Sequence, residues 1–415
     1  MKMRVSSKLA NNDVQFNLRS QESRLNKATN QMGSQRRIQQ LRDDPLAAGH
    51  LVRYKSYLGR VNQFEKNAQT LTDLYSVSEG YIDQSVQIMQ RLRELAITGA
   101  NGVYTKEDTQ KMAIEVDELL KELINIGNAV GPDGSALFAG TRAQNTAYDV
   151  QMGNVKGARQ SMITNVSYNG SIDDNKVEVD EGAYMSLNKA GNSIFWAEPQ
   201  KLYGLRNALS YQVQTDSVIS VDGHNINIHA GDNVYAIVAN INNSGAAVKA
   251  SLDPVTKGLN LETTDSRQLW LDDIEGTALS DLGIIKASDQ RPPSNIAPSA
   301  RVSGGSLFDT VIALRDALIV GDSEVVGAKV LGGLDRGLDN LLQRLAETGA
   351  HFERAQQNIA RAQTNELNVT NMVSREGDLD ITEAITNMKM LEYVNKATLS
   401  TAAKLYDTTL LNYIR

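Results

Sequence analysis

The chain has 415 residues, of which 41% are hydrophobic and 22% are charged, a composition typical of a folded protein rather than a disordered one. It contains no cysteine, which excludes disulfides and thiolate metal sites, and only four histidines. The net charge of −7 is uneven, because residues 1–60 hold twelve Lys or Arg and four Asp or Glu, which is +8 and leaves −15 for the rest. We expect this basic arm to contact acidic surfaces of neighbouring subunits rather than nucleic acid.

No apolar run approaches the roughly 18 residues that a membrane span needs, so we expect no membrane insertion. The first residues, Met1 to Arg4, are followed by polar sequence and lack the apolar stretch of a cleaved secretory signal.

The pattern of the N-terminal segment 5–32 predicts a thin helix, that is, one with few apolar side chains to bury. Val5, Leu9 and Phe16 form a short apolar stripe, and a second stripe repeats every seven residues among many polar side chains, at Leu18, Leu25 and Met32. Because a helix without a packed apolar face is marginal, this segment needs a partner.

A proline-free stretch, 46–131, predicts a long helix followed by a second one. The first carries a sustained heptad, which is typical of helices that supercoil around neighbours: Val61, Ala68, Tyr75, Ile82, Met89 and Ala96. Thr105 with Asp108 resembles a capping box that opens the second helix. Gly131-Pro132-Asp133-Gly134 predicts its end, so a helix hairpin is expected.

Between 146 and 302 the pattern changes to short strands. Asn169-Gly170 and Asp222-Gly223 each lie between period-two patterns, which predicts two hairpins. Further strands are expected at 248–252, 259–263 and 269–271, with a short helix at 233–243.

The C-terminal stretch again predicts long helices. Apolar and small residues alternate by four and three from Leu334 to Val373, and Asp380 can cap a last helix that runs to Ile414. The fold class expected is therefore mainly α, with long antiparallel coiled-coil-like helices from both chain ends and an inserted β-rich module. We predict three domains: residues 1–42 with 376–415, residues 43–145 with 303–375, and the module 146–302.

No catalytic, metal or cofactor site emerges from the sequence. Gly327-Ala328-Lys329 lacks the Ser or Thr of a phosphate loop, because Val330 stands there. Asp378 and Asp380 stand at a helix start, where an acidic cap explains them without a metal. We therefore predict a protein that is not an enzyme.

Four motifs in order along the chain carry a resemblance to a known family. They are the basic block 32–38 leading to Asp-Asp-Pro-Leu-Ala-Ala at 43–48, Leu-Phe-Ala-Gly-Thr at 137–141, Gly-Ala-His-Phe-Glu-Arg at 349–354, and Asp-Leu-Asp at 378–380. The chain resembles the flagellin superfamily, and within it the hook-associated proteins of the hook–filament junction. The motif positions are Asp43, Asp44, Pro45, Phe138, Gly140, Gly349, Arg354, Asp378 and Asp380. Gln35 replaces a usual glycine and Leu41 a usual proline, so the break between the first two helices is expected to be less sharp.

The resemblance implies paired terminal helices in an inner domain, a helical second domain and an outward β-rich domain. It implies export unfolded through the flagellar type III channel with a chaperone, and a ring of copies between the other hook–filament junction protein and flagellin. The location implied is the bacterial flagellum, outside the cell, or in the periplasm if the flagellum is internal.

We expect assembly contacts on the thin terminal helices. The residues are Val5, Leu9, Phe16, Leu25, Met388, Leu391, Tyr406, Leu410 and Ile414. Two alternatives stay open: a flagellin or the other junction protein, and an adhesin or enzyme built on the β module. The second alternative requires a pocket of convergent polar groups, for instance around His224, His229 and Trp270.

Overall fold

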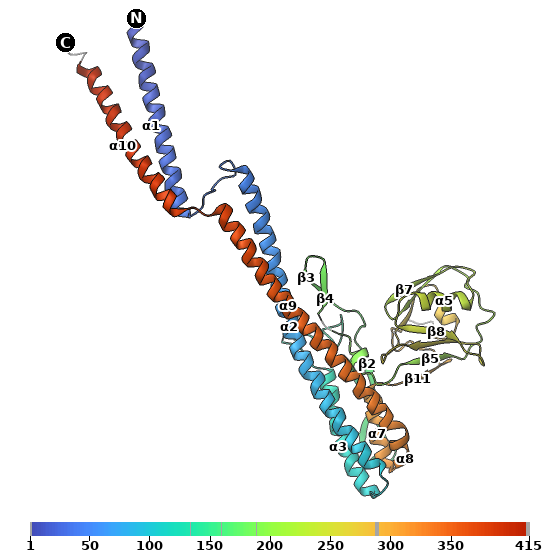
Figure 1. The fold of residues 1–415 in the computed structure, drawn as a ribbon. Coiled ribbons are helices and arrows are strands. Elements are labelled where there is room, and N and C mark those ends of the chain that lie inside the picture. Colours follow the sequence, from blue (N-terminus) through green and yellow to red (C-terminus); the bar gives the residue numbers. More distant parts are fainter. Residues whose placement is uncertain (1, 133, 159, 188, 287–289, 412–415) are drawn as a thin grey trace. The chain divides into compact units, whose positions relative to one another are not determined.

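The computed structural model describes the backbone of residues 2–411, except 133, 159, 188 and 287–289, and side chains between residues 12 and 404. Contacts divide the chain into two units, residues 1–66 with 359–415 and residues 67–358. The elements are mostly helical with an inserted β region (Figure 1), which confirms the predicted fold class. The division into three domains stays a prediction. Among the described residues, no helix has the length and apolarity that crossing a membrane requires.

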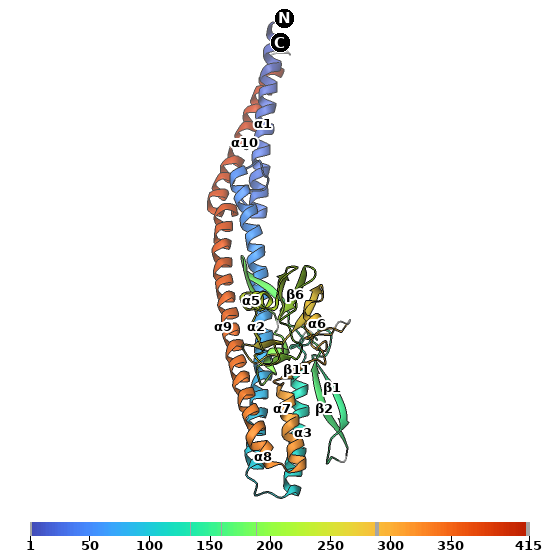
Figure 2. The ribbon, with the colours of Figure 1, turned by 90° about the vertical axis from the view of Figure 1, so that its right-hand side faces the viewer.

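The first unit contains the two terminal helices, α1 (Lys2–Ser34) and α10 (Ile381–Leu411), with the start of α2 (Pro45–Ala100) and the end of α9 (Leu331–Gly377). α1 and α10 lie side by side (Figures 1 and 2) and run antiparallel, because the end of α1 meets the start of α10 in a bridge between Arg36 and Asp378. This arrangement is the pairing of chain ends that the sequence predicts.

The break between α1 and α2 is complete, contrary to the expectation drawn from Gln35 and Leu41. Gln35 adopts a φ of 54°, the left-handed conformation that glycine accepts most easily, and residues 35–44 lie outside the helices. The side chain at this position therefore does not prevent the turn.

The second unit contains a helical bundle. The rest of α2 and the start of α9 accompany α3 (Lys106–Gly127) and α7 (Leu307–Val320), and α3 packs on α7 (Figure 2). The heptad predicted in α2 is confirmed, since each of its six leading positions is buried: Val61, Ala68, Tyr75, Ile82, Met89 and Ala96.

Caps and turns decide where these helices begin and end. The Thr105 side chain accepts a hydrogen bond from the Asp108 N–H at 3.3 Å, as predicted, and Ser306 with Asp309 forms a full capping box on α7. After α7, the short helix α8 (Ser323–Val325) leads to a π-helical turn, η1 (Val326–Val330), which continues into α9. The sequence analysis did not predict this π turn, because a single extra residue in a helix leaves little trace in periodicity.

The inserted β region has four antiparallel sheets, in the strand orders β1-β2, β3-β4, β10-β6-β7 and β11-β5-β9-β8. The strands are β1 (Tyr148–Asn154), β2 (Ser161–Tyr168), β3 (Lys176–Asp180), β4 (Ala183–Ser186), β5 (Lys201–Gly204), β6 (Ser217–Val221), β7 (His224–Ile228), β8 (Val248–Leu252), β9 (Leu259–Thr263), β10 (Leu271–Glu275) and β11 (Ala300–Ser303). Three short helices accompany them: α4 (Gly191–Ile194), α5 (Val234–Asn243) and α6 (Ala278–Asp281).

The two Asx-Gly signals behave differently. Asp222 and Gly223, with φ values of 49° and 80°, turn β6 into β7, which confirms the predicted hairpin. The hairpin predicted at Asn169-Gly170 is wrong. β2 pairs with β1, the strand before it in sequence, and β3 pairs with β4, so β2 and β3 do not form a hairpin. Period-two patterns on both sides of a turn signal do not say whether the two strands pair with each other.

The β region has its own core and is also tied to the long helices. One apolar cluster joins β5 to β10 with α5, and a separate cluster fills the bundle together with β1 and β2. The β3–β4 hairpin contacts α2, since Asn67 donates to the Glu178 carbonyl at 2.7 Å and the Tyr75 hydroxyl donates to the Ser186 carbonyl. The sheets are therefore anchored on the helices of the same unit.

Candidate assembly site

The junction of the four long helices gathers all four acidic motif residues, Asp43, Asp44, Asp378 and Asp380. At this junction the Arg37 N–H donates to the Gly377 carbonyl at 2.8 Å, and the Leu379 N–H donates to the Gln35 carbonyl at 3.1 Å. The Arg37 guanidinium reaches the Glu376 carbonyl at 2.8 Å and Asp44 at 3.3 Å. The turn between α1 and α2 and the turn between α9 and α10 are thus joined by two backbone hydrogen bonds and the Arg37 side chain.

Asp43 and Asp44 organise the turn before α2. A hydrogen bond from Lys27, at 2.8 Å, and bonds from the N–H groups of Gln40 and Gln39 lower the pKa of Asp43 to about 2. The Asp44 carboxylate accepts the Ala47 N–H at 3.1 Å, and this bond lowers the pKa of Asp44. Pro45 opens the helix directly after this cap, the position where its missing N–H costs nothing.

Asp378 and Asp380 likewise accept hydrogen bonds in the segment that links α9 to α10. The Ser374 hydroxyl donates to Asp378 at 2.5 Å, and one Asp380 oxygen accepts the N–H groups of Thr382 and Glu383 at 2.9 and 3.1 Å. Asp380 therefore caps α10, as the sequence analysis expects. Within the described residues, no group of three His, Asp or Glu is placed to hold a metal ion.

The residues expected to make assembly contacts lie on more than one face. Leu25, Met388 and Leu391 are half-buried, on the faces that α1 and α10 turn to each other, whereas Phe16 is 74% exposed. The side chains of Val5, Leu9, Tyr406 and Leu410, and all of Ile414, lie outside the described residues. These assignments stay predictions.

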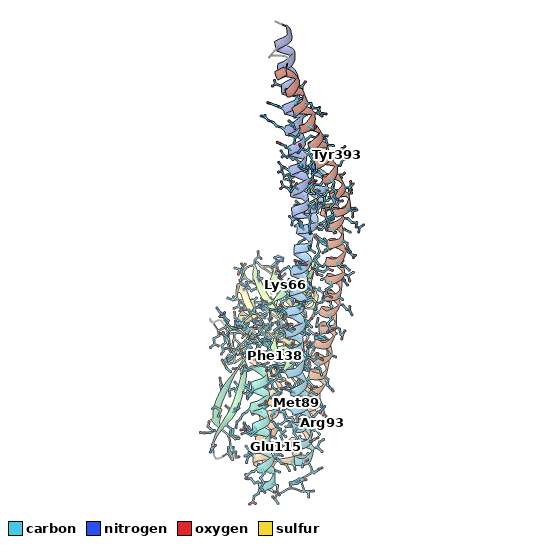
Figure 3. All side chains as sticks on the ribbon, turned by 90° about the vertical axis from the view of Figure 1, so that its left-hand side faces the viewer. Lys66, Met89, Arg93, Glu115, Phe138 and Tyr393 are labelled. Atoms are coloured by element: carbon cyan, nitrogen blue, oxygen red, sulfur yellow. The ribbon has the colours of Figure 1, made fainter. Side chains whose placement is uncertain are left out.

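Exposed apolar residues on α10 extend this list. Tyr393 is 75% exposed (Figure 3), Met390 is 66% exposed and Leu399 is 51% exposed. The sequence analysis missed Met390 and Tyr393 because it followed one stripe along the helix, and these residues lie off that stripe. Exposed apolar side chains on helices that are short of buried surface are typical of an association surface.

The other motif residues belong to the second unit. Phe138 is buried edge-on against Phe195, and Gly140 has a φ of 62° with no room for a Cβ, which would stand 2.3 Å from the Ser171 carbonyl oxygen. Gly349 and the exposed Arg354 lie on α9. These positions serve the packing of the bundle or its surface and are not gathered at the junction.

A chain of charged groups connects the β region with α9. Arg267 pairs with Asp222 at 2.7 Å and with Asp265 at 2.6 Å, and Arg344 then pairs with Asp265 at 3.0 Å. Glu347, which closes the chain, accepts from Arg344 at 3.1 Å and from Lys189 at 2.9 Å. Burial opposes ionisation of Glu347, but bonds and charge from Lys189 and Arg344 outweigh it and lower its pKa to about 2. These ion pairs link the β region to α9.

The residues that an enzyme or adhesin would need in the β region do not converge. His224 lines an open polar hollow of about 510 Å³ beside Asn225 and Asn227, His229 lies near Asp216 at 3.8 Å, and Trp270 packs against Tyr168. His229 and Trp270 are not among the residues that line the hollow. The geometry thus offers the second alternative no support.

Sequence comparisons match the N-terminal helices and part of the β region. The model of the bacterial flagellin N-terminal helical region matches residues 5–143, and the flagellin hook IN motif matches residues 212–265. The first match covers α1, α2 and α3, and the second lies within the β region. The chain belongs to the flagellin superfamily. This superfamily consists of structural proteins of the flagellum without enzymatic activity, so membership confirms the predicted flagellar location and the prediction that the chain is not an enzyme.

Individual relatives of this superfamily member are distant. A flagellar filament 31.3 kDa core protein from Treponema maltophilum is 30% identical over 124 residues, which are 30% of this chain and 43% of that protein. Flagellar hook-associated protein 3 from Escherichia coli K12 is 22% identical over 193 residues, which are 46% of this chain and 57% of that protein. The chain thus matches about half or less of the length of these relatives. A crystal structure of hook-associated protein 3 from Legionella pneumophila is 14% identical, with a TM-score of 0.46 over 82% of this chain and 98% of that one.

Proposed function

We propose that this flagellin-superfamily chain is a structural subunit at the hook–filament junction of the bacterial flagellum, the role of hook-associated protein 3. The observation that carries the proposal is the hook IN motif at 212–265, inserted between helices whose terminal pair exposes apolar residues. The 22% identity to hook-associated protein 3 of Escherichia coli supports the same role.

In this role the terminal helices assemble and the β region lies outward. Residues 1–42 with 376–415 form the inner assembly domain, residues 43–145 with 303–375 the helical domain, and residues 146–302 the outer domain. Copies form a ring through apolar residues of α1 and α10, such as Phe16 and Tyr393, each at least 74% exposed in the single chain. The basic arm 1–60, with a charge of +8, meets acidic faces of adjacent subunits.

The partners proposed are copies of the chain, the other hook–filament junction protein, flagellin, and a flagellar export chaperone that delivers the chain unfolded to the type III channel. The location is outside the cell, or the periplasm where the flagellum is internal. Neither membrane insertion nor nucleic acid is part of this role.

The test uses the absence of cysteine in the chain. Val255 lies in a β-region turn and is 86% exposed, so Val255→Cys offers one site for a maleimide dye without disturbing a buried contact. We expect a single labelled spot at the boundary of hook and filament in cells that carry the variant. The cysteine-free parent, treated with the same dye, is the control, and label distributed along the whole filament would reject the junction role.

A flagellin role is the second candidate, favoured by the 30% identity to the Treponema maltophilum core protein. Flagellins polymerise into long filaments, whereas a junction subunit closes a short ring. Negative-stain microscopy of the purified chain, seeded with hook fragments, separates the two. Filaments that lengthen as chain is added favour the flagellin role.

A further inference from the structure

The seam between α1 and α10 contains two partly buried amides with buried side-chain oxygens, Gln21 on α1 and Asn395 on α10. On α1 six half-buried positions follow steps of four and three, at Val14, Leu18, Gln21, Leu25, Ala28 and Met32, and Ser20 and Gln31 beside them are also half-buried. On α10 the same steps give the half-buried Ala384, Met388, Leu391, Asn395 and Thr398 and the buried Ala402, with Val394 half-buried beside them. Such a rhythm is the seam of a two-helix coiled coil.

The junction sets which positions face each other. Because the helices run antiparallel from the Arg36–Asp378 bridge, we match their seam positions in order away from it, starting four residues from Arg36 on α1 and six residues from Asp378 on α10. This matching gives the pairs Met32 with Ala384, Ala28 with Met388, Leu25 with Leu391, Gln21 with Asn395, Leu18 with Thr398 and Val14 with Ala402. Gln21 and Asn395 are thus matched in the fourth layer from the junction, about 22 Å from the bridge along α1 and about 26 Å along α10 at 1.5 Å per residue.

The side-chain oxygens of Gln21 and Asn395 are buried, and neither has a hydrogen-bond partner. The remaining polar residue of the seam, Thr398, satisfies its hydroxyl on the Val394 carbonyl at 2.8 Å. In the matched seam, the facing amide can supply the missing donor. Each amide carries an NH₂ group, and rotation about the last side-chain bond exchanges oxygen and nitrogen at little cost.

We propose that Gln21 and Asn395 form a hydrogen-bonded amide pair that fixes the alignment of the two terminal helices. In the native alignment each amide meets the other. A slip by one heptad sets Gln21 against Met388 or Ala402, which leaves a buried amide unpaired. An antiparallel pair of two α1 helices from different copies, with their seam layers aligned, sets Gln21 against Leu25 and carries the same penalty. A polar layer in an otherwise apolar seam selects alignment and partner at some cost in stability.

Engineered disulfides in the full chain test the proposal, because the chain has no cysteine of its own. Leu18→Cys with Thr398→Cys reports the native alignment. Leu25→Cys with Thr398→Cys reports a slip of one heptad, which native helices hold about 10 Å apart along the axis, beyond disulfide reach. Both pairs are made with the amide layer intact and with Gln21→Leu plus Asn395→Leu. The fraction of intrachain disulfide is measured on dilute protein by mass spectrometry.

We expect the slipped disulfide to rise about tenfold when both amides become leucine, because the unpaired-amide penalty disappears. A matched control, Gln15→Leu with Asn387→Leu, makes the same changes at exposed positions of α1 and α10 and leaves the slipped fraction low. Since the junction also resists slipping, the comparison is repeated with Arg37→Ala, which removes the guanidinium bonds to Glu376 and Asp44. Equal slipped fractions with and without the amide layer, in both backgrounds, overturn the proposal.

Discussion

Single residues of this chain carry constraints that only their surroundings reveal. Gly140 has a φ of 62° and lies close to the Ser171 carbonyl. The position therefore requires glycine twice, for its left-handed conformation and for the absence of a Cβ. Gln35 accepts a similar φ without a glycine because it lies exposed at the end of α1. The sequence motif identifies the first position as special, but the contact that makes it so joins residues 31 positions apart.

Gly140→Ala is expected to lower the free energy of unfolding by about 2–4 kcal/mol, because left-handed strain adds to the clash with Ser171. Gly134→Ala is the matched control, since Gly134 has a φ of 77° and open space around its Cα. It should cost only the strain, about 1–2 kcal/mol. Urea unfolding followed by circular dichroism measures both, and equal losses would contradict the clash.

A buried arginine on α7 makes a second residue-scale prediction. Arg315 is fully buried and donates to Asp117 of α3 at 3.0 Å and to the Ile163 carbonyl of β2 at 2.7 Å. Arg315→Met leaves Asp117 without this partner, so we expect a loss of about 3–5 kcal/mol in thermal unfolding. Arg93→Met, which breaks an exposed pair with Asp335, should cost less than about 1 kcal/mol. A similar loss for both variants would argue against a special role of the buried ion pair.

At the scale of elements, the fold depends on how helices and sheets are fastened together. α3 and α7 are joined through Arg315, the β3–β4 hairpin is bonded to α2, and the charged chain from Asp222 to Lys189 connects the β region to α9. These hydrogen bonds and ion pairs involve partly buried charges and backbone carbonyls, which produce no periodic pattern in the sequence. Sequence periodicity therefore predicts the elements and not the links between them.

The charged chain predicts a dependence of stability on pH. The pKa of Glu347 lies at about 2 in the folded chain, below its ordinary value of 4.5, so its stabilising effect is present above pH 4.5 and is lost as the pH falls toward 2. We expect Glu347→Gln to remove about 1 kcal/mol of stability at pH 7, a value reduced for the partial exposure of the group. The difference from the parent should shrink as the pH falls from 5 to 3 in urea titrations. A difference that is constant with pH would exclude ionisation of Glu347 as its source.

At the scale of the whole molecule, stability and assembly are expected to reside in different parts of the chain. Residues 67–358 form a unit with two apolar cores of their own, whereas α1 and α10 expose large apolar residues. A change in the terminal helices should therefore affect association more than folding.

Deletion of residues 391–415 is expected to leave the bundle of 46–131 and 305–375 folded and to abolish ring formation. Circular dichroism and thermal unfolding check the fold, and chemical cross-linking with hook components checks assembly. Tyr393→Ser with Leu399→Ser is the milder variant, because it keeps the helix and removes two exposed apolar side chains. Normal rings from the deletion variant would refute the assembly role of α10.

The sequence by itself determined the long helices, the α2 heptad, the caps at Thr105 and Asp380 and the Asp222-Gly223 hairpin. These features depend on side chains within a few residues of one another, so periodicity and capping chemistry suffice. Only the tertiary structure decided that β2 pairs with β1, that Arg37 joins two chain reversals, and that the side-chain oxygens of Gln21 and Asn395 are buried. Such pairings join residues far apart in sequence, and packing over the whole chain selects among partners that local patterns leave equivalent.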